Sequence, residues 1–519
     1  MTAPADRIFT NAAVHTLAGD DGDGEQAGEA DAEAVAVRDG RIVRIGSAYE
    51  VAFLEGVGTD VVDLAGGVLL PGFVDAHTHL PMVGRSLVHA DLSTAESPDD
   101  AVALLRESAR DDREWILGYG YDESSWDESR YLTREDLDGV SEDRPVAAFR
   151  EDMHTASLNS VALDRLADSM PEGDVKREGG EATGVVVEAA VDPVFAATDP
   201  DAEGMRDLVV AARDRAHELG VTGVHDMVRN SAAPQVYREL DAAGELDLRV
   251  RLNYWTDHLD SLVDLGVRTN HGTGFVRVGA VKSFTDGSFG ARTAKLSSPY
   301  EGTDEDGQWV VDPDELREFV ARADDAGLQF TAHAIGDDAI ETVLDAYADT
   351  ADPAGARHRV EHAELLTDEA VGRFADLDVV ASVQPNFLKW AREDGLYEDR
   401  LGRERTRATN RYRDLLDAGV PLAFGSDCMP MDPLLGVEQA VTAPGECQRL
   451  TVSEALRAYT RGAAYAAFEE DEAGTVEVGK RTDFTVLAES PWEVPSERIG
   501  DVDVTHTVVD GRVVHRRND

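Results

Sequence analysis

One short segment, residues 69–80, constrains this chain more than any other. An apolar run leads into two histidines, His77 and His79, at what we predict to be the end of a buried strand. Alternate residues on a strand point to the same side, so these two imidazoles project together while Thr78 faces away. Paired neutral imidazoles often hold a divalent metal, but two histidines this close also occur by chance. The pair predicts a metal site only if further ligands follow.

Further candidate ligands do follow, each at the end of a predicted strand. Strand and helix patterns alternate through the middle of the chain, and we expect eight parallel strands that end near His79, Asp226, Tyr254, Lys282, His333, His362, Gln384 and Asp427. Eight such units predict an α/β fold, a (β/α)8 TIM-like barrel, whose chemistry lies at the carboxyl ends of its strands. The predicted metal ligands are therefore His77, His79, Lys282, His333, His362 and Asp427.

The remaining residues predict an insertion and a second, smaller domain. The gap from about residue 90 to 205 is too long for one helical crossover, so we expect a large insertion after the first barrel strand, with strands near 115–118, 146–149 and 184–187. Short strands joined by turns fill residues 1–66 and 466–519, one of them at 475–478. These two parts predict one small β-sandwich built from both termini, with the barrel and its insertion over 67–465.

The charge of the chain is unusual. It has 103 acidic and 49 basic residues, for a formal net charge of −54, and the acidic residues are dispersed along its length. In molar salt the Debye length falls to about 3 Å, which makes such self-repulsion tolerable. We interpret the composition as adaptation to concentrated salt, in preference to an acidic surface for a basic partner, which predicts local charge blocks. The charge also argues against nucleic acid and anionic membranes as partners.

Targeting and redox signals are weak. Cys428 and Cys447 are too few for a disulfide framework, the first residues do not resemble a signal peptide, and no apolar run approaches the length of a membrane span. We therefore expect a cytoplasmic protein that acts on a small-molecule substrate. A homodimer is left open.

Lys282 is the unusual member of the predicted ligand set, because an ammonium group is not a ligand. Burial among cations would depress its pKa, and a neutral amine can capture CO2 to form a carbamate whose two oxygens bridge two metals. The alternative is an ordinary ion pair with a carboxylate such as Asp286. The scarcity of lysine in this chain favours the carbamate.

On these motifs the chain resembles the amidohydrolase superfamily of metal-dependent hydrolases. The resemblance is carried by residues 71–79, 281–288, 333–337, 361–364 and 425–427. Residues 115–122 and 154–163 resemble the YtcJ-like branch, which includes N-substituted formamide deformylases and proteins described as exoenzyme regulators.

The resemblance implies a role for each predicted ligand. It implies His77 and His79 on one metal, His333 and His362 on the other, and carbamylated Lys282 as the bridge. Asp427 is then expected to contact both the first metal and the attacking hydroxide. The implied cofactor is a pair of zinc ions, with a single metal as the alternative.

The predicted reaction is hydrolysis of a non-peptide carbon–nitrogen bond of the amide type by a metal-bound hydroxide. Asp427 is the predicted catalytic residue, first as general base and then as general acid. One alternative is a deaminase or cyclic-amide hydrolase on the same barrel, although superfamily deaminases tend to lack a lysine on strand four. Another is a non-catalytic metal-binding regulatory protein.

Five residues are weaker predictions for substrate binding. Two lie in the insertion, where a lid over the barrel mouth is expected, one follows a glycine-rich turn after the Lys282 strand, and two lie at the end of the seventh strand. In that order they are His154, Asn159, Arg292, Gln384 and Asn386. For each of them local hydrogen bonding or a surface ion pair is the alternative interpretation.

Overall fold

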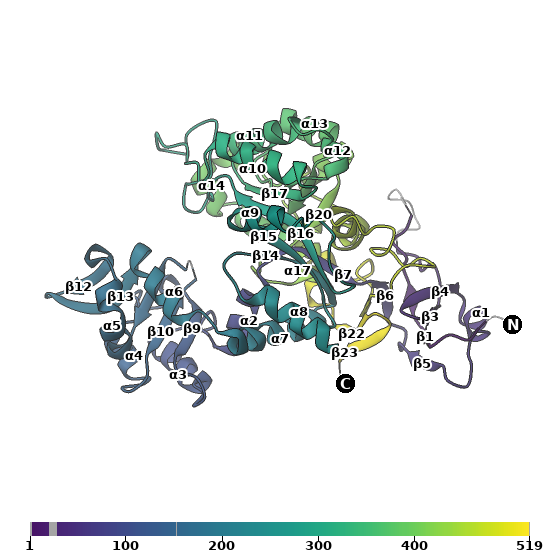
Figure 1. Cartoon of the computed structure of the whole chain (residues 1–519), viewed down its shortest axis with the longest axis horizontal. Coiled ribbons are helices and arrows are strands. Elements are labelled where there is room, and N and C mark those ends of the chain that lie inside the picture. Colours follow the sequence, from purple (N-terminus) through teal and green to yellow (C-terminus); the bar gives the residue numbers. More distant parts are fainter. Residues whose placement is uncertain (1–2, 20–27, 152, 518–519) are drawn as a thin grey trace. The chain divides into compact units, whose positions relative to one another are not determined.

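The computed structural model describes residues 3–19, 28–151 and 153–517 (Figure 1). Its central element is an eight-stranded sheet in which every pairing is parallel. Across the sheet the strands are β7 (Phe73–Thr78), β14 (Val221–Val228), β15 (Arg249–Trp255), β16 (Val276–Phe284), β17 (Gln329–Ala334), β18 (Arg359–His362), β19 (Val380–Val383) and β20 (Leu422–Phe424).

The two edge strands of this sheet meet. The backbone amides of Ser426 and Asp427, just after β20, donate to the carbonyl of His77 on β7 at 3.1 and 2.7 Å. Gly425 permits this approach, because a Cβ atom there would lie 2.4 Å from the His77 nitrogen. The sheet is therefore a nearly closed barrel, and the prediction of eight parallel strands is confirmed.

Helices between the strands bury one face each. On α10 (Pro313–Asp325) the side chains of Leu316, Val320 and Ala323 are buried, at the spacing of one helical face. The hydroxyl of Thr367 caps α13 (Asp368–Leu377) by accepting from an amide of its first turn. None of the helices within the described ranges is long and apolar enough to cross a membrane.

Two further sheets lie outside the barrel, and the second of them combines residues from both ends of the chain. One has the order β4 (Arg41–Gly46), β3 (Ala34–Arg38), β1 (Arg7–Thr10), β5 (Asp60–Asp63). The other has the order β2 (Ala13–Val14), β6 (Val68–Pro71), β21 (Phe484–Leu487), β22 (Val504–Val509), β23 (Arg512–Arg516). Buried side chains from both sheets, including Phe9, Val35, Leu69 and Phe484, form one hydrophobic cluster.

The strand predicted at 475–478 is not formed. Val478 is 64% exposed, and the Lys480 ammonium donates to the Thr475 hydroxyl at 2.6 Å and pairs with Glu477 at 2.9 Å. These local side-chain bonds hold the segment in a turn, which competes with a sheet ladder. The prediction of a strand at 475–478 was therefore wrong.

Residues 80–212 form a compact unit of their own. Its six-stranded sheet has the order β12 (Val175–Glu178), β13 (Glu181–Val187), β11 (Thr155–Leu158), β10 (Val146–Arg150), β9 (Ile116–Tyr121), β8 (Ala90–Asp91). The stretches predicted as strands near 115–118, 146–149 and 184–187 fall on β9, β10 and β13. A cluster that includes Trp115, Phe149 and Leu158 gives this unit its own core.

The cluster shared by the two terminal sheets can be tested at Phe9, which is fully buried and has its ring 5.7 Å from that of Phe484. We expect Phe9→Ala to lower the free energy of unfolding by about 3–5 kcal/mol, because it leaves a cavity between residues from opposite ends of the chain. Denaturant titration measures this. Phe53→Ala, at a site that is 72% exposed, is the matched control and should change stability by about 0.5 kcal/mol or less. Equal effects of the two substitutions would contradict a shared core.

Candidate metal centre

Six predicted residues converge at the carboxyl ends of the barrel strands. Ligand atoms of His77, His79 and Asp427 lie within 4.8 Å of one another, close enough to hold one cation. The rings of His77 and His333 lie 5.0 and 4.4 Å from that of His362, centroid to centroid. Lys282 acts electrostatically on all four histidines and opposes the protonation of each, although Asp427 outweighs burial and Lys282 at His79 and raises the pKa of that ring.

The tautomer of His77 is fixed by a buried carboxylate. Its Nδ1 donates to Glu361 Oε2 at 2.7 Å, which leaves the Nε2 lone pair free as a ligand. Burial lowers the pKa of His77, followed by the charge of Lys282, so the ring is neutral at pH 7. A neutral imidazole with a fixed donor on one side is the form that binds a metal.

His79 is oriented from the other side. Its Nδ1 donates to the Met227 carbonyl at 3.2 Å, and its Nε2 lies 3.4 Å from Asp427 Oδ1. Burial by itself raises the pKa of Asp427, but His77 and His79 outweigh it and hold that pKa below its usual range. Asp427 is therefore ionised and lies between the two imidazoles of β7.

His333 and His362 supply a second pair of ring nitrogens. His333 Nε2 donates to the Gly287 carbonyl at 2.9 Å, so the lone pair lies on Nδ1. His362 Nδ1 is buried and has no hydrogen-bond partner among the described residues. Its backbone has φ 71°, and Asp427 has φ 52°, a left-handed conformation that is rare for residues with a side chain and recurs at functional sites.

Lys282 is buried, and its Nζ also has no hydrogen-bond partner among the described residues. Burial lowers its pKa to about 8, against the opposing charges of Glu361 and Asp427. Asp286 does not pair with it, because that carboxylate accepts from the backbone amides of Lys295, Ile335 and Gly336 at 2.8–3.1 Å.

A buried donor or lone pair without a hydrogen-bond partner destabilises the fold unless a bound ion, a ligand or water satisfies it. The donor set of four imidazoles, a carboxylate and a desolvated amine fits a divalent cation with nitrogen and oxygen ligands.

The sequence interpretation missed Arg359 and Glu361 on β18. Arg359 is fully buried, and its Nη2 lies 2.8 Å from Glu361 Oε1 and donates to the Ala76 carbonyl at 2.7 Å. Burial by itself raises the pKa of Glu361, but Arg359 and His77 hold it well below its usual range. Two opposite charges at i and i+2 of a buried strand were the available signal, because both must point into the barrel.

Three of the weaker predictions also lie on the barrel. Gln384 Nε2 is 3.4 Å from His77 Nδ1, while its Oε1 and Asn386 Oδ1 are buried without a partner among the described residues. Arg292 has φ 56° and an ion pair of 3.8 Å with Asp399. Their roles in substrate binding stay predictions.

His154 and Asn159 belong to the 80–212 unit. The His154 side chain is 71% exposed and lies 3.3 Å from Glu188. Asn159 caps α5 (Ser160–Leu166): its Oδ1 accepts from two backbone amides and its Nδ2 donates to two carbonyls, all at 2.8–3.0 Å. These contacts explain Asn159 as a helix cap, and a substrate contact of either residue stays a prediction.

Comparison with known proteins agrees with this geometry. The family model described as "Amidohydrolase family" matches residues 60–515. The chain belongs to the amidohydrolase family. It is 32% identical to YtcJ of Bacillus subtilis, over 94% of this chain and 96% of that protein. It is 28% identical to the N-substituted formamide deformylase of Arthrobacter pascens, over 100% of this chain and 99% of that protein.

Solved structures show the same fold. An uncharacterized metal-dependent hydrolase from Pyrococcus furiosus superposes with a TM-score of 0.79 at 30% identity, over 94% of this chain and 100% of that one. A second, from Pyrococcus horikoshii, gives a TM-score of 0.79 at 28% identity over 94% and 99%. The chain is thus a hydrolase of the metal-dependent amidohydrolase superfamily.

Glu361 can be tested as the residue that orients His77. We expect Glu361→Gln to weaken metal binding about 10–100-fold, because the ligand loses the carboxylate that fixes its tautomer. Competition with a chelator measures this, and thermal unfolding separates it from the cost of leaving Arg359 unpaired. Glu341→Gln, which removes a half-buried ion pair with Arg373 away from the metal centre, is the matched control. Unchanged metal affinity in a folded Glu361 variant would refute the orienting role.

Proposed function

We propose that this chain hydrolyses a non-peptide carbon–nitrogen bond of the amide type in a small molecule, such as an N-acyl or N-formyl compound. The observation that carries the proposal is the convergence of four imidazoles, Lys282 and Asp427 at one end of the barrel. The N-substituted formamide deformylase, which aligns with the whole chain, supports this substrate class. The comparisons do not favour a non-catalytic regulatory protein.

His77, His79 and Asp427 would hold one cation, and His333 and His362 a second, which we propose to be zinc. Such a cation supplies Lewis acidity toward the substrate carbonyl and lowers the pKa of water toward about 7. Asp427 is ionised beside His77 and His79, so one of its carboxylate oxygens can accept a proton from water and then deliver it to the departing nitrogen. Gln384 and Asn386, with unused buried oxygens, are proposed to orient the substrate, and Arg292 to bind a carboxylate on it.

We further propose that Lys282 carries a carbamate. A buried amine with a pKa of about 8 and no hydrogen-bond partner among the described residues has a neutral fraction at pH 7 that can add to CO2. The new N–C bond forms with loss of one proton from the amine to solvent, and the carbamate anion would replace an unsatisfied donor by two acceptor oxygens.

A deaminase or a cyclic-amide hydrolase on the same barrel is the alternative. Lys282 argues against the deaminase, since deaminases of the superfamily tend to lack this lysine. A panel of open-chain amides, cyclic amides and aminopurines, assayed side by side, distinguishes the three reactions.

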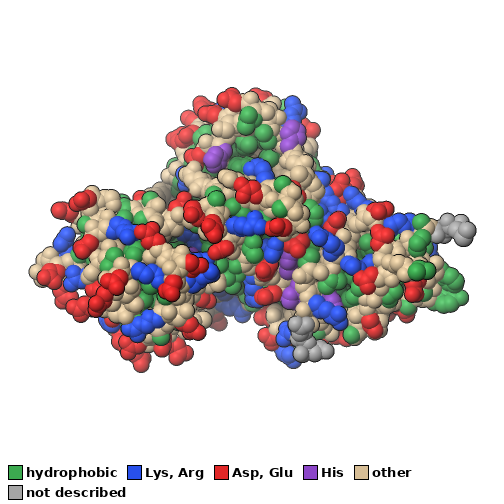
Figure 2. Space-filling view, turned by 60° about the horizontal axis from the view of Figure 1, so that its bottom comes forward, with side chains coloured by type: hydrophobic (Ala, Val, Ile, Leu, Met, Phe, Trp, Pro, Cys, Tyr) green, Lys and Arg blue, Asp and Glu red, His purple; other side chains and the backbone are tan. Residues whose placement is uncertain are grey.

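The acidic surface supports adaptation to concentrated salt. Figure 2 shows aspartate and glutamate side chains spread over the face in view, without one dominant patch. We therefore propose that the assays need molar salt.

Asp427 is the first residue to test. We expect Asp427→Asn to lower kcat at least about 100-fold, because the amide cannot take a proton from water. Steady-state kinetics with a hydrolysed amide measure this, with metal content determined for each variant. Asp432→Asn, a few residues along, is the control: Asp432 caps α17 (Pro433–Val441), and asparagine also caps helices. Full activity in the metal-loaded Asp427 variant would refute the mechanism.

The carbamate has a direct spectroscopic test. Because the chain has five lysines in all, protein equilibrated with ¹³C-bicarbonate should show a carbamate resonance that is readily assigned. We expect Lys282→Ala to abolish both this resonance and activity. Lys295→Ala, which breaks an ion pair with Asp306, should keep both. A native enzyme that is fully active without the resonance would exclude the modification.

A further inference from the structure

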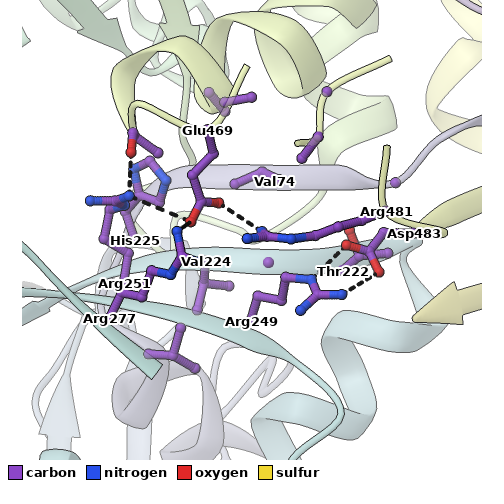
Figure 3. A pocket seen from close by; sticks show the side chains of 18 of the residues that line it. Val74, Thr222, Val224, His225, Arg249, Arg251, Arg277, Glu469, Arg481 and Asp483 are labelled. Carbon is purple, nitrogen blue, oxygen red and sulfur yellow. Dashed lines mark hydrogen bonds and ion pairs between the residues drawn. The ribbon is translucent and has the colours of Figure 1, made fainter. Parts of the chain in front are cut away.

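A small cavity lies at the opposite end of the barrel from the metal centre. Its lining includes the first residues of strands β7, β14, β15 and β16, and the segment before β21 (Figure 3). Its charged lining residues are Arg249, Arg251, Arg277, Arg481, Glu469 and Asp483. In TIM barrels this end serves stability, and the proposed chemistry above makes no use of it.

One buried donor at this cavity, on Arg251, has no acceptor among the described residues, and a second donor, on His225, lies beside it. Arg251 is 4% exposed, and its Nη1 is buried without a hydrogen-bond partner among the described residues. His225 lies at the same register on the neighbouring strand and also lines the cavity. The Nδ1 atom of His225 accepts from Arg359 Nη1 at 2.9 Å, because a guanidinium can only donate. The proton of the neutral His225 ring therefore lies on Nε2. Figure 3 shows the two side chains next to each other.

The charges around the cavity are paired with one another. Four arginines and two carboxylates line it. Glu469 is shared by three arginines, because it pairs with Arg277 at 2.8 Å and Arg481 at 3.1 Å and lies 3.7 Å from Arg251 Nη2. Asp483 is taken by Arg249 at 2.6 Å. Two more exposed carboxylates pair with the same arginines, Glu472 with Arg481 and Asp510 with Arg249 at 3.6 Å, so the charges balance while Arg251 Nη1 still has no acceptor among the described residues.

The unmatched Nη1 belongs to a buried guanidinium whose carboxylate neighbour, Glu469, is 3.7 Å away and shared with two other arginines, so an acceptor with negative charge suits it. The cavity has a volume of about 50 Å³. Sites for drug-sized ligands are roughly 300–1,000 Å³, so this cavity suits a single small ion. We propose that it binds one halide-sized monovalent anion, held by Arg251 Nη1 and the Nε2–H of His225 between strands β14 and β15.

Bromide tests the site directly. Crystals of the full-length, metal-loaded protein are grown without halide and soaked in 50–100 mM potassium bromide, about ten times below molar salt to limit surface binding. They should show an anomalous peak between Arg251 and His225. In solution, replacing gluconate by bromide at constant ionic strength should raise Tm saturably by about 2 °C. A cavity that holds only water in the soaked crystals overturns the proposal, whatever the Tm.

A matched pair of variants assigns the effect to the cavity. Arg251→Met and Arg249→Met each remove one arginine from the lining, but the Arg249 guanidinium is already used by Asp483 and the Gly274 carbonyl. We expect the bromide-dependent Tm shift to disappear in the Arg251 variant and to persist in the Arg249 variant. Equal shifts in both would overturn the assignment. Should Arg251→Met fail to fold, the crystal of the unchanged protein decides alone.

Discussion

The buried ion pair between Arg359 and Glu361 is the interaction on which the rest of the barrel depends. Both side chains are completely buried, and a buried charge is tolerated only where its partner and hydrogen bonds replace water. Arg359 meets this condition by bonding the Ala76 carbonyl, the Ser382 hydroxyl at 2.8 Å and His225. One guanidinium thereby connects strands β7, β14, β18 and β19. An apolar pair of similar size would fill the same space but would leave His77 without its orienting carboxylate.

This pair also explains why an amine can be buried at the metal centre. Lys282 lies where burial opposes its charge, while Glu361 and Asp427 favour it. Its Nζ is 5.9 Å from the ring centroids of both Trp255 and Phe284, so part of its surroundings is aromatic. Burial and the two carboxylates together leave the amine with a pKa of about 8, so a fraction of it is neutral near neutral pH. A lysine on the surface would stay protonated, and a lysine paired with one carboxylate would be held as a cation.

The sequence predicted the parts of this site that follow from strand periodicity. The histidine pair on β7 and the single polar residues at the ends of β16, β17 and β18 needed only the rule that strand ends meet at one rim. Register then places Phe284 beside His333, and Ala334 beside His362, as the structure shows. The rule did not distinguish ligands from the residues that hold them, so Arg359 and Glu361 were missed. Outside the barrel, the strand prediction failed at 475–478, where Lys480 and Thr475 bond locally.

The cavity at the far end shows a different limit of sequence interpretation. Arg251 and Arg481 are 230 positions apart in the sequence. They line one cavity only because the fold brings the segment before β21 next to β15. A continuous line of contacts runs from this cavity to the metal centre, through His225, Arg359 and Glu361 to His77, with distances of 2.9, 2.8 and 2.7 Å. Contact alone is not coupling, because coupling needs an element with two arrangements. Arg359 is held by acceptors from four strands, so a second arrangement would break several buried contacts at once. An anion at the far end is therefore expected to stabilise the barrel that positions His77, without switching the site on or off.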